Sequence, residues 1–348
     1  MINKNYLVAI GFLIGVAAPL GNVAHADTTQ FTFIVGSDPQ PWRLNDMPGD
    51  QGDPNSSKQK TAWSNIVNPT YSSMSALGAS FAIINGDMTE YGRESTWNDT
   101  TAAYGKAKLP VFWGLGNHDY ENNVDDCVDG GGTNYNNCAA NSLYHLSFLL
   151  RYGVTNAIPL KNQDMLFNSF VIPNLYGPYK NGTGYHAQGS LSYSFEYGGI
   201  HFVQLNNYPD YSIPKEINNN MYYYFSTSSA LGWLDKDLRD AQARGQKIIL
   251  NYHIAGGDSG RGNMNTLTDG LKRILSTYKV SAIFAGHWHE WNYDGNYFNN
   301  IPLFVSDAIF HGGYYKVSVD SKGMTVAAMN GVTGKAVPVN GKSYRVNW

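Results

Sequence analysis

The sequence is poor in charged residues and has no basic segment. Only 15% of its 348 residues are charged, and 24 Lys and Arg stand against 27 Asp and Glu, for a net charge of −3. Because a nucleic-acid groove needs clustered Lys and Arg, we expect none in this protein. Beyond residue 26 the sequence also lacks an apolar stretch of the roughly 20 residues that a membrane-spanning helix requires, so we expect no membrane span.

The first 26 residues differ from the rest of the chain. Lys4 precedes an apolar run from Tyr6 to Leu20, and Ala24-His25-Ala26 follows this run. A basic start, a short apolar run and an A-x-A site are the parts of a Sec-type signal peptide. We therefore expect cleavage after Ala26 and a periplasmic or secreted mature chain of residues 27–348. An uncleaved membrane anchor is the alternative.

Cysteine is scarce as well. The two cysteines, Cys127 and Cys138, lie in a segment rich in Gly and Asn. An oxidising compartment favours a disulfide bond between them. In the chain-entropy model, a bond that closes so short a loop contributes about 3 kcal/mol to stability. Two free thiols, or a cysteine-based metal site, are the alternatives.

Short apolar runs alternate with segments that have helical spacing. We predict strands in the runs FTFIVGSD, FAIINGD, PVFWGLGNHD, KIILNYHIAGG and SAIFAGHWH, a hairpin around Gly198-Gly199, and helices over 61–79, 231–241 and 271–278. This alternation indicates an α/β protein in which helices cover the sheets. The stretch 120–185, rich in Asn, Gly and Tyr, is predicted to be an irregular insertion in a single domain of residues 27–348.

Five of the strand-like runs end in turns that carry side chains able to bind metals. These side chains are Asp38, Asp87, Asn117 with His118, His253, and the pair His287 and His289. In an extended segment, residues two apart point to the same side, so both histidines of the pair could face one point. A single Asp after a strand is commonly a turn residue, and a lone H-x-H pair is weak evidence. Five such endings in order are hard to explain by turn chemistry, because ligands of layered α/β folds bind at the carboxyl ends of strands.

The order of these motifs resembles that of the calcineurin-like metallophosphoesterases, which is D-x-H, G-D, G-N-H-D/E, a lone His and G-H-x-H. The resemblance runs from Asp38 to His289. It implies a four-layer β-sandwich flanked by helices, with two divalent metal ions about 3.5–4 Å apart.

The resemblance also implies a role for each residue. Asp38, Asp87 and His289 would hold one metal, and Asp87, Asn117, His253 and His287 would hold the second. Asp87 is the bridge, because a carboxylate can bind two cations where one imidazole nitrogen cannot. His118 would be catalytic, and Asp119 would orient it by a hydrogen bond.

Position 40 departs from the family pattern, because Gln40 stands where the first motif usually has His. A D-x-Q variant resembles the branch of manganese-dependent ADP-ribose/CDP-alcohol diphosphatases. Either Gln40 binds the metal through its carbonyl oxygen, or the first site is weak. If Gln40 binds the metal, its hard oxygen favours Mn²⁺ or another hard ion, and Zn²⁺, Fe or Ca²⁺ are the alternatives.

Two other branches of the family differ from this sequence. Purple acid phosphatases carry Tyr three residues after the bridging Asp, where this chain has Glu90 and places Tyr91 one position too late. The Ser/Thr phosphoprotein phosphatases carry an Arg that is missing from GDMTEYG. Arg93 lies beyond that motif, either as an exposed helix-start residue or within reach of a phosphate.

Two further groups have a functional and a structural interpretation. Aromatic residues near the motifs would form either a substrate rim or ordinary core: Trp42, Trp113, Trp288, Trp291 and Tyr293. An acidic cluster would bind Ca²⁺ or form a solvated loop: Asp125, Asp126 and Asp129. The structural interpretation is favoured for the acidic cluster and at least as good for the aromatic residues.

We therefore predict a secreted or periplasmic binuclear-metal phosphoesterase that hydrolyses a phosphate ester by attack of metal-bound hydroxide. The substrate would be a small-molecule or lipid phosphoester, either a phosphodiester or a phosphomonoester. The alternative is a metal-bearing, non-catalytic binding or toxin-like module that recognises a partner through 120–185. An intact His118 favours the enzyme, because metal binding alone does not need it. No feature of the sequence specifies an oligomeric state.

Overall fold

The computed structural model describes residues 28–44, 57–127, 135–152, 158–173, 181–218, 222–256 and 266–348. The predicted signal peptide lies outside these residues, as does Asp129 of the acidic cluster. Among the helices of the described part, none is long and apolar enough to cross a membrane.

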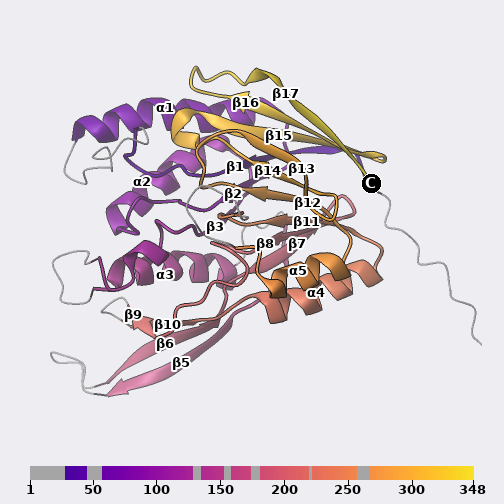
Figure 1. The fold of residues 1–348 in the computed structure, drawn as a ribbon. Coiled ribbons are helices and arrows are strands. Elements are labelled where there is room, and N and C mark those ends of the chain that lie inside the picture. The colour runs from indigo at the N-terminus through magenta and orange to yellow at the C-terminus, as the bar shows by residue number, and fades with distance from the viewer. Residues whose placement is uncertain are drawn as a thin grey trace, which may run out of the picture.

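Two sheets form the centre of the molecule (Figure 1). The first has six strands in the order β17-β16-β15-β1-β2-β3. They are β1 (Phe31–Gly36), β2 (Ala82–Asn85), β3 (Val111–Gly114), β15 (Gly313–Asp320), β16 (Gly323–Asn330) and β17 (Val337–Asn347). The second has seven strands in the order β13-β14-β12-β11-β8-β7-β4. They are β4 (Leu160–Gln163), β7 (Tyr193–Tyr197), β8 (Ile200–Gln204), β11 (Lys247–Asn251), β12 (Val280–Ala285), β13 (Asn292–Phe298) and β14 (Ile301–Val305).

Aromatic rings join the facing sides of the two sheets. The ring of Phe112 on β3 stacks on that of Phe195 on β7, with 3.7 Å between centroids. The ring of Phe33 on β1 meets those of Phe202 on β8 and Phe284 on β12 edge to face, at 5.1 and 6.2 Å. Offset-stacked and edge-to-face pairs add to the stabilisation that burial of the rings already gives. The sheets therefore pack as a sandwich with an aromatic interior.

Helices cover the outer faces of the sandwich. Figure 1 shows α1 (Ser57–Ser75), α2 (Glu94–Tyr104) and α3 (Asn137–Tyr152) on one side, and α4 (Leu231–Ala243) and α5 (Asp269–Thr277) on the other. On α4, Leu234 and Leu238 belong to the same buried cluster as Ile248 of β11, at the helical spacing expected from the sequence. The predicted α/β sandwich of two sheets flanked by helices is confirmed.

The sequence-based boundaries hold to within a few residues. The predicted helix over 61–79 is α1, which begins and ends earlier, at Ser57 and Ser75. The predicted hairpin is formed by β7 and β8, which pair antiparallel across Gly198 and Gly199. Gly198 and Gly199 have φ of 57° and 82°, a conformation that favours glycine.

The stretch 120–185 is more regular than predicted. It contains α3, whose Ala139, Leu143, Leu146 and Leu150 are buried at helical spacing. It also begins a third sheet, of order β5-β6-β10-β9. That sheet consists of β5 (Leu166–Pro173), β6 (Asn181–Gly189), β9 (Ile217–Asn218) and β10 (Tyr223–Thr227). The prediction of an irregular segment was wrong, because its Asn, Gly and Tyr content obscured the periodicity of α3.

Cys127 and Cys138 form a disulfide bond, as predicted. Both side chains are buried, at 6% and 0% exposure. The bond ties the loop after β3 to the first turn of α3, and its two cysteines are 11 positions apart in the sequence. A cross-link of this kind stabilises a protein chiefly by restricting its unfolded chain.

We expect the double substitution Cys127→Ser and Cys138→Ser to lower the free energy of unfolding by about 2–4 kcal/mol, because the unfolded chain regains its freedom. Urea unfolding followed by circular dichroism measures this difference. Dithiothreitol should destabilise the parent chain to the same extent and leave the double variant unchanged. Equal unfolding midpoints for parent and variant would contradict the assigned contribution.

Candidate metal centre

The loops that carry the predicted ligands meet at one edge of the sandwich. Asp38 follows β1, Asp87 follows β2, Asn117 and His118 follow β3, His253 follows β11, and His287 and His289 follow β12. Strands β1, β2 and β3 run parallel, as do β8, β11, β12 and β14, so their carboxyl ends share an edge. Backbone hydrogen bonds join neighbouring loops, from Asp38 N to Gly86 O at 3.1 Å and from Gly286 N to His253 O at 3.0 Å.

Two groups of side chains have Asp87 in common. The first is Asp87, His253 and His287, and the second is Asp38, Asp87 and His289. Within each group the candidate ligand atoms lie within 4.8 Å of one another. The amide oxygen of Asn117 lies 3.1 Å from His253 Nε2, beside the first group. A carboxylate shared by two groups of candidate ligands is an arrangement that suits a pair of cations.

The Oε1 atom of Gln40 is buried and has no hydrogen-bond partner among the described residues. The Oδ2 atom of Asp87 faces His253 Nε2 at 3.2 Å and pairs with that ring when the ring is protonated. Both side chains are 0% exposed, and a buried acceptor without a partner costs about 1–3 kcal/mol. A cation at Gln40 Oε1 would remove that cost, and a cation at Asp87 Oδ2 would replace the proton of His253, so the residues present fit a metal.

Five residues of the centre have a left-handed backbone conformation. The φ angles are 57° at Asp38, 26° at Gln40, 49° at Asp87, 73° at His287 and 53° at His289. Such a conformation costs a non-glycine residue of order 1–3 kcal/mol and is concentrated at functional sites. The prediction that His287 and His289 lie in an extended segment was therefore wrong, since β12 ends at Ala285. The turn sends the two imidazoles to different groups around Asp87.

The two aspartates are ionised although they are buried. Burial alone would raise the pKa of Asp38, but His289 and His253 outweigh burial and hold that pKa well below its ordinary value. Burial likewise opposes ionisation of Asp87, and His253 and His118 lower its pKa. Two carboxylates therefore face the centre as anions.

The histidines respond to this charge in opposite ways. Burial lowers the pKa of His253, but Asp87 and Asp38 reverse the effect and raise it to about 9. Burial and the neighbouring His253 lower the pKa of His287 to about 4. His287 is thus a neutral imidazole near neutral pH, whereas His253 must lose a proton before it can bind a cation.

The predicted contact from Asp119 to the imidazole of His118 is not what the structure shows. The carboxylate of Asp119 accepts hydrogen bonds from the backbone of Met88, Thr89 and Gly116 at 3.0, 2.8 and 2.8 Å, and from Thr89 Oγ1. It lies beneath the loop that follows β2, where these donors satisfy its oxygens, while burial and the charge of Asp87 raise its pKa to about 7. Asp119 therefore holds the loop that contains Asp87 and does not contact the His118 ring.

His118 is positioned by Asp87 and by Glu90. Its backbone N–H donates to Asp87 Oδ1 at 2.9 Å. Its ring nitrogen Nδ1 lies 3.2 Å from the Glu90 carbonyl oxygen and 3.4 Å from Glu90 Oε1. Burial would lower the pKa of His118, but Asp87 and Glu90 raise it to about 9. Sequence reasoning noted Glu90 only as a replacement for Tyr and missed this contact.

Most of the aromatic residues near the motifs belong to the core. Trp42 and Trp113 are core residues, at 4% and 5% exposure. Trp291 and Tyr293 pack against the same core. Trp288 packs against the second core, under α4 and α5. Asp125, from the acidic cluster, forms an ion pair with Lys215 and accepts from Asn136. The structural interpretation therefore fits these residues better than a substrate rim or a calcium site.

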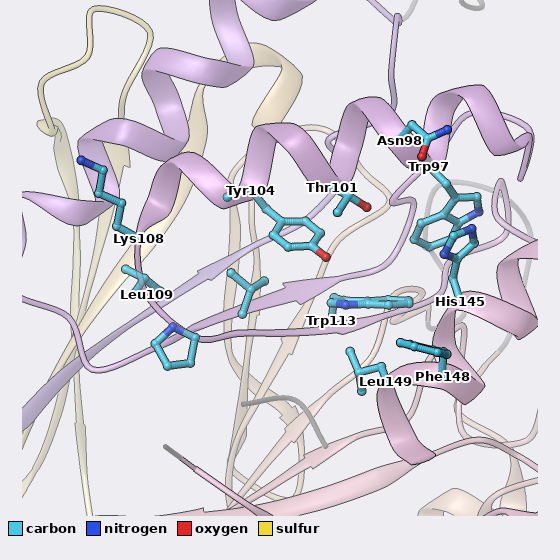
Figure 2. A pocket seen from close by; sticks show the side chains of 13 residues that line it. Trp97, Asn98, Thr101, Tyr104, Lys108, Leu109, Trp113, His145, Phe148 and Leu149 are labelled. Carbon is cyan, nitrogen blue, oxygen red and sulfur yellow. The ribbon is translucent and has the colours of Figure 1, made fainter. Parts of the chain in front are cut away.

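A large cavity lies apart from the candidate ligands. This cavity of about 740 Å³ between α2 and α3 is walled by Trp97, Trp113, Phe148 and other residues that Figure 2 shows. Its one histidine, His145, stacks on Trp97 at 4.7 Å and lies 3.0 Å from Glu94, and none of its lining residues is a candidate ligand.

A smaller cavity of about 240 Å³ adjoins the metal centre itself. It is lined by His118 and Glu90 together with Tyr91, Arg93, Asn122, Asn123, Asp126 and Cys127. The guanidinium of Arg93 lies over the Tyr91 ring, 4.9 Å from its centroid. Of the residues discussed for the centre, His118 and Glu90 border this smaller space.

Comparison with known proteins agrees with this architecture. Purple acid phosphatase 23 of Arabidopsis thaliana is 27% identical over a region that covers 38% of this chain and 28% of that protein, so the match spans less than a third of the relative. The chain is similar in fold to a dimetal phosphatase from Danio rerio, with a TM-score of 0.54, 12% identity and coverage of 92% of this chain and 100% of the other.

A second solved structure is a purple acid phosphatase from yellow lupin (Lupinus luteus) seeds. Its TM-score is 0.51 at 16% identity, over 92% of this chain and 54% of the lupin chain. Position 90 of the present chain nevertheless holds Glu, so the likeness does not extend to the Tyr that marks that branch.

The family model described as calcineurin-like phosphoesterase matches residues 71–291. This range is well over half of the 348 residues. It contains the loops of Asp87, Asn117, His253 and the histidine pair, whereas Asp38 and Gln40 precede it. The chain therefore belongs to the calcineurin-like phosphoesterase family, whose members are metal-dependent phosphoric ester hydrolases.

Proposed function

We propose that this protein is a binuclear-metal phosphoesterase that hydrolyses a small-molecule or lipid phosphoester, a monoester or a diester. The observation that carries the proposal is the position of Asp87, which is buried and shared by both groups of candidate ligands. When bound, two divalent cations supply positive charge for the phosphoryl oxygens and lower the pKa of an attacking water.

The ligand roles follow from the two groups. One cation would be held by Asp38, Gln40, Asp87 and His289, and the other by Asp87, Asn117, His253 and His287. The unpartnered oxygen of Gln40 supports its place in the first set. Because that oxygen is a hard ligand, Mn²⁺ is the favoured metal.

His118 has the features of a general acid. Both Glu90 oxygens near Nδ1 are acceptors, so Nδ1 carries a hydrogen and Nε2 is left for the substrate. A pKa raised to about 9 keeps the ring doubly protonated near neutral pH, which places a proton on Nε2 for the departing oxygen. A non-catalytic metal module would have no use for a histidine held in this way.

We also propose that the mature chain begins at Asp27 and works outside the cytoplasm. The disulfide between Cys127 and Cys138 supports an oxidising compartment, since such bonds are rare in reducing ones.

Asp87→Asn should be the most damaging ligand substitution, because both cations depend on this carboxylate. We expect a loss of roughly 10³-fold or more in turnover and loss of both metals on dialysis. Asp38→Asn, which changes one group only, should cost one metal and leave the other. Metal analysis of the dialysed variants checks both expectations, and an Asp87→Asn protein with full activity and two metals would refute the shared site.

His118→Asn should separate two classes of substrate. An alkoxide leaving group needs a proton, whereas nitrophenolate is already a stable anion, so hydrolysis of alkyl phosphoesters should fall about 10²–10⁴-fold and that of nitrophenyl phosphoesters far less. The measurement is turnover of both substrates by parent and variant at equal metal content. Equal losses on the two substrates would show that His118 supplies charge and not a proton.

Uptake of Mn²⁺ should release a proton from His253. Its pKa is raised to about 9 in the metal-free protein, so below that pH the cation must displace one proton. The apparent affinity should then rise about tenfold per pH unit between pH 6 and 8.

Calorimetric titration in buffers of different ionisation enthalpy counts the released protons. His287→Ala is the matched control, because this histidine is already neutral: the variant should bind more weakly with the same proton count. An affinity independent of pH would overturn the assignment.

A further inference from the structure

Glu90 is a buried acid with partners on two other segments, the loop after β1 and the loop after β3. Its side chain is 1% exposed. It accepts a hydrogen bond from Gln40 Nε2 at 3.0 Å, and Arg43 Nη1 lies 3.4 Å from its Oε2. Its Oε1 lies 3.4 Å from His118 Nδ1. A single carboxylate thus contacts both the unusual residue of the first motif and the proposed general acid.

The contact with Glu90 decides how the Gln40 amide is oriented. An ionised carboxylate only accepts hydrogen bonds, so the NH₂ end of the amide must face Glu90 and the carbonyl end must face elsewhere. That carbonyl oxygen, Oε1, is buried without a donor among the described residues. The backbone N–H of Gln40 donates to the Asp87 carbonyl oxygen at 3.2 Å, which places the residue against the bridging aspartate.

The same reasoning applies to the ring of His118. Both atoms that face Nδ1 are acceptors, namely the carbonyl oxygen and Oε1 of Glu90. The hydrogen on Nδ1 is thereby fixed, and so is the plane of the ring. The guanidinium of Arg43 balances the charge of Glu90, since an unpaired buried carboxylate would be costly.

We propose that Glu90 is a positioning residue that orients Gln40 for metal binding and His118 for proton transfer at once. This inference rests on the function proposed above for the same site. Partners of this kind typically contribute 10–100-fold to metal affinity or activity, because they fix ligands that would otherwise rotate.

The first test measures metal binding by calorimetric titration of the metal-free protein with Mn²⁺. Glu90→Ala should weaken one of the two sites by about 10–100-fold and leave the other unchanged. Gln40→Ala should weaken the same site, and adding Glu90→Ala to it should change little more, because Glu90 acts there through Gln40. If the two losses multiply in the double variant, Glu90 does not act through Gln40 and the inference fails.

The second test measures the ratio of turnover on alkyl and nitrophenyl phosphoesters at saturating Mn²⁺. Glu90→Ala should lower this ratio in the direction of His118→Asn, and it should have no further effect on the ratio in a His118→Asn background. Glu90→Gln keeps the shape and one acceptor oxygen, so its ratio should lie between those of the parent and Glu90→Ala. An unchanged ratio in both Glu90 variants would overturn the link to His118.

Asp237→Asn is the matched control. Asp237 is also a buried carboxylate, 3% exposed, and it lies 2.8 Å from a histidine nitrogen, His201 Nε2, on the outer side of the seven-stranded sheet. Its substitution should lower stability, measured by urea unfolding, without changing the Mn²⁺ titration or the substrate ratio. If Asp237→Asn changes them as much as Glu90→Ala does, the Glu90 effect is general destabilisation and the inference fails.

The outcomes separate this inference from the proposed function. Should the parent protein hydrolyse neither substrate, the proposed function fails, while the Mn²⁺ titration still tests the coupling of Glu90 to Gln40. Should the parent be active and every Glu90 variant match it in both tests, the inference alone is wrong.

Discussion

The carboxylate of Asp87 is the group on which the rest of the centre depends. It is fully buried, its Oδ1 accepts from the His118 backbone at 2.9 Å, and its Oδ2 faces His253 Nε2 at 3.2 Å. Two glycines make room for it. A Cβ at Gly116 would lie 2.2 Å from Asp87 Oδ1, and one at Gly86, where φ is 85°, would lie 2.8 Å from the ring of His253. No side chain fits at either place, so the glycines of the G-D and G-N-H motifs are a steric requirement of the shared ligand.

The sandwich brings this carboxylate together with ligands from a second sheet. Asp38, Asp87 and Asn117 follow strands of the six-stranded sheet, whereas His253, His287 and His289 follow strands of the seven-stranded sheet. Polar contacts next to the ligands hold the two edges in register: Ser37 and Ser306 hydroxyls lie 2.9 Å apart, and Gln204 Nε2 donates to Asn85 Oδ1 at 3.1 Å. A site supported by rigid strands on both sides keeps its ligands in place with little conformational freedom.

The sequence revealed what is encoded locally. A ligand after an apolar run can be recognised from neighbouring residues, so the α/β fold and the five ligand-bearing loops were predictable. Contacts between distant segments were not: Gln40 and Glu90 are separated by 50 positions, and no spacing rule connects them. The predicted contact of Asp119 with the His118 ring was wrong because four other donors bind the Asp119 carboxylate. They lie in its own loop and in the loop after β2. The turn at His287 was mistaken because a left-handed histidine is a rare conformation that tertiary structure imposes.

Gln40 differs from the other proposed ligands because its amide cannot exchange a proton for a cation. In the metal-free protein the negative charge of Asp38 and Asp87 is balanced by a proton on His253, whose pKa they raise to about 9. Histidine and aspartate can exchange a cation for a proton in this way. The amide of Gln40 has no such option, because it neither gains nor loses a proton near neutral pH and its oxygen only accepts. Its buried Oε1 can be satisfied by a cation or a donor, and the described residues supply no donor. Gln40 can bind a cation at once only if its amide is already oriented. The hydrogen bond from Gln40 Nε2 to the buried carboxylate of Glu90 provides that orientation.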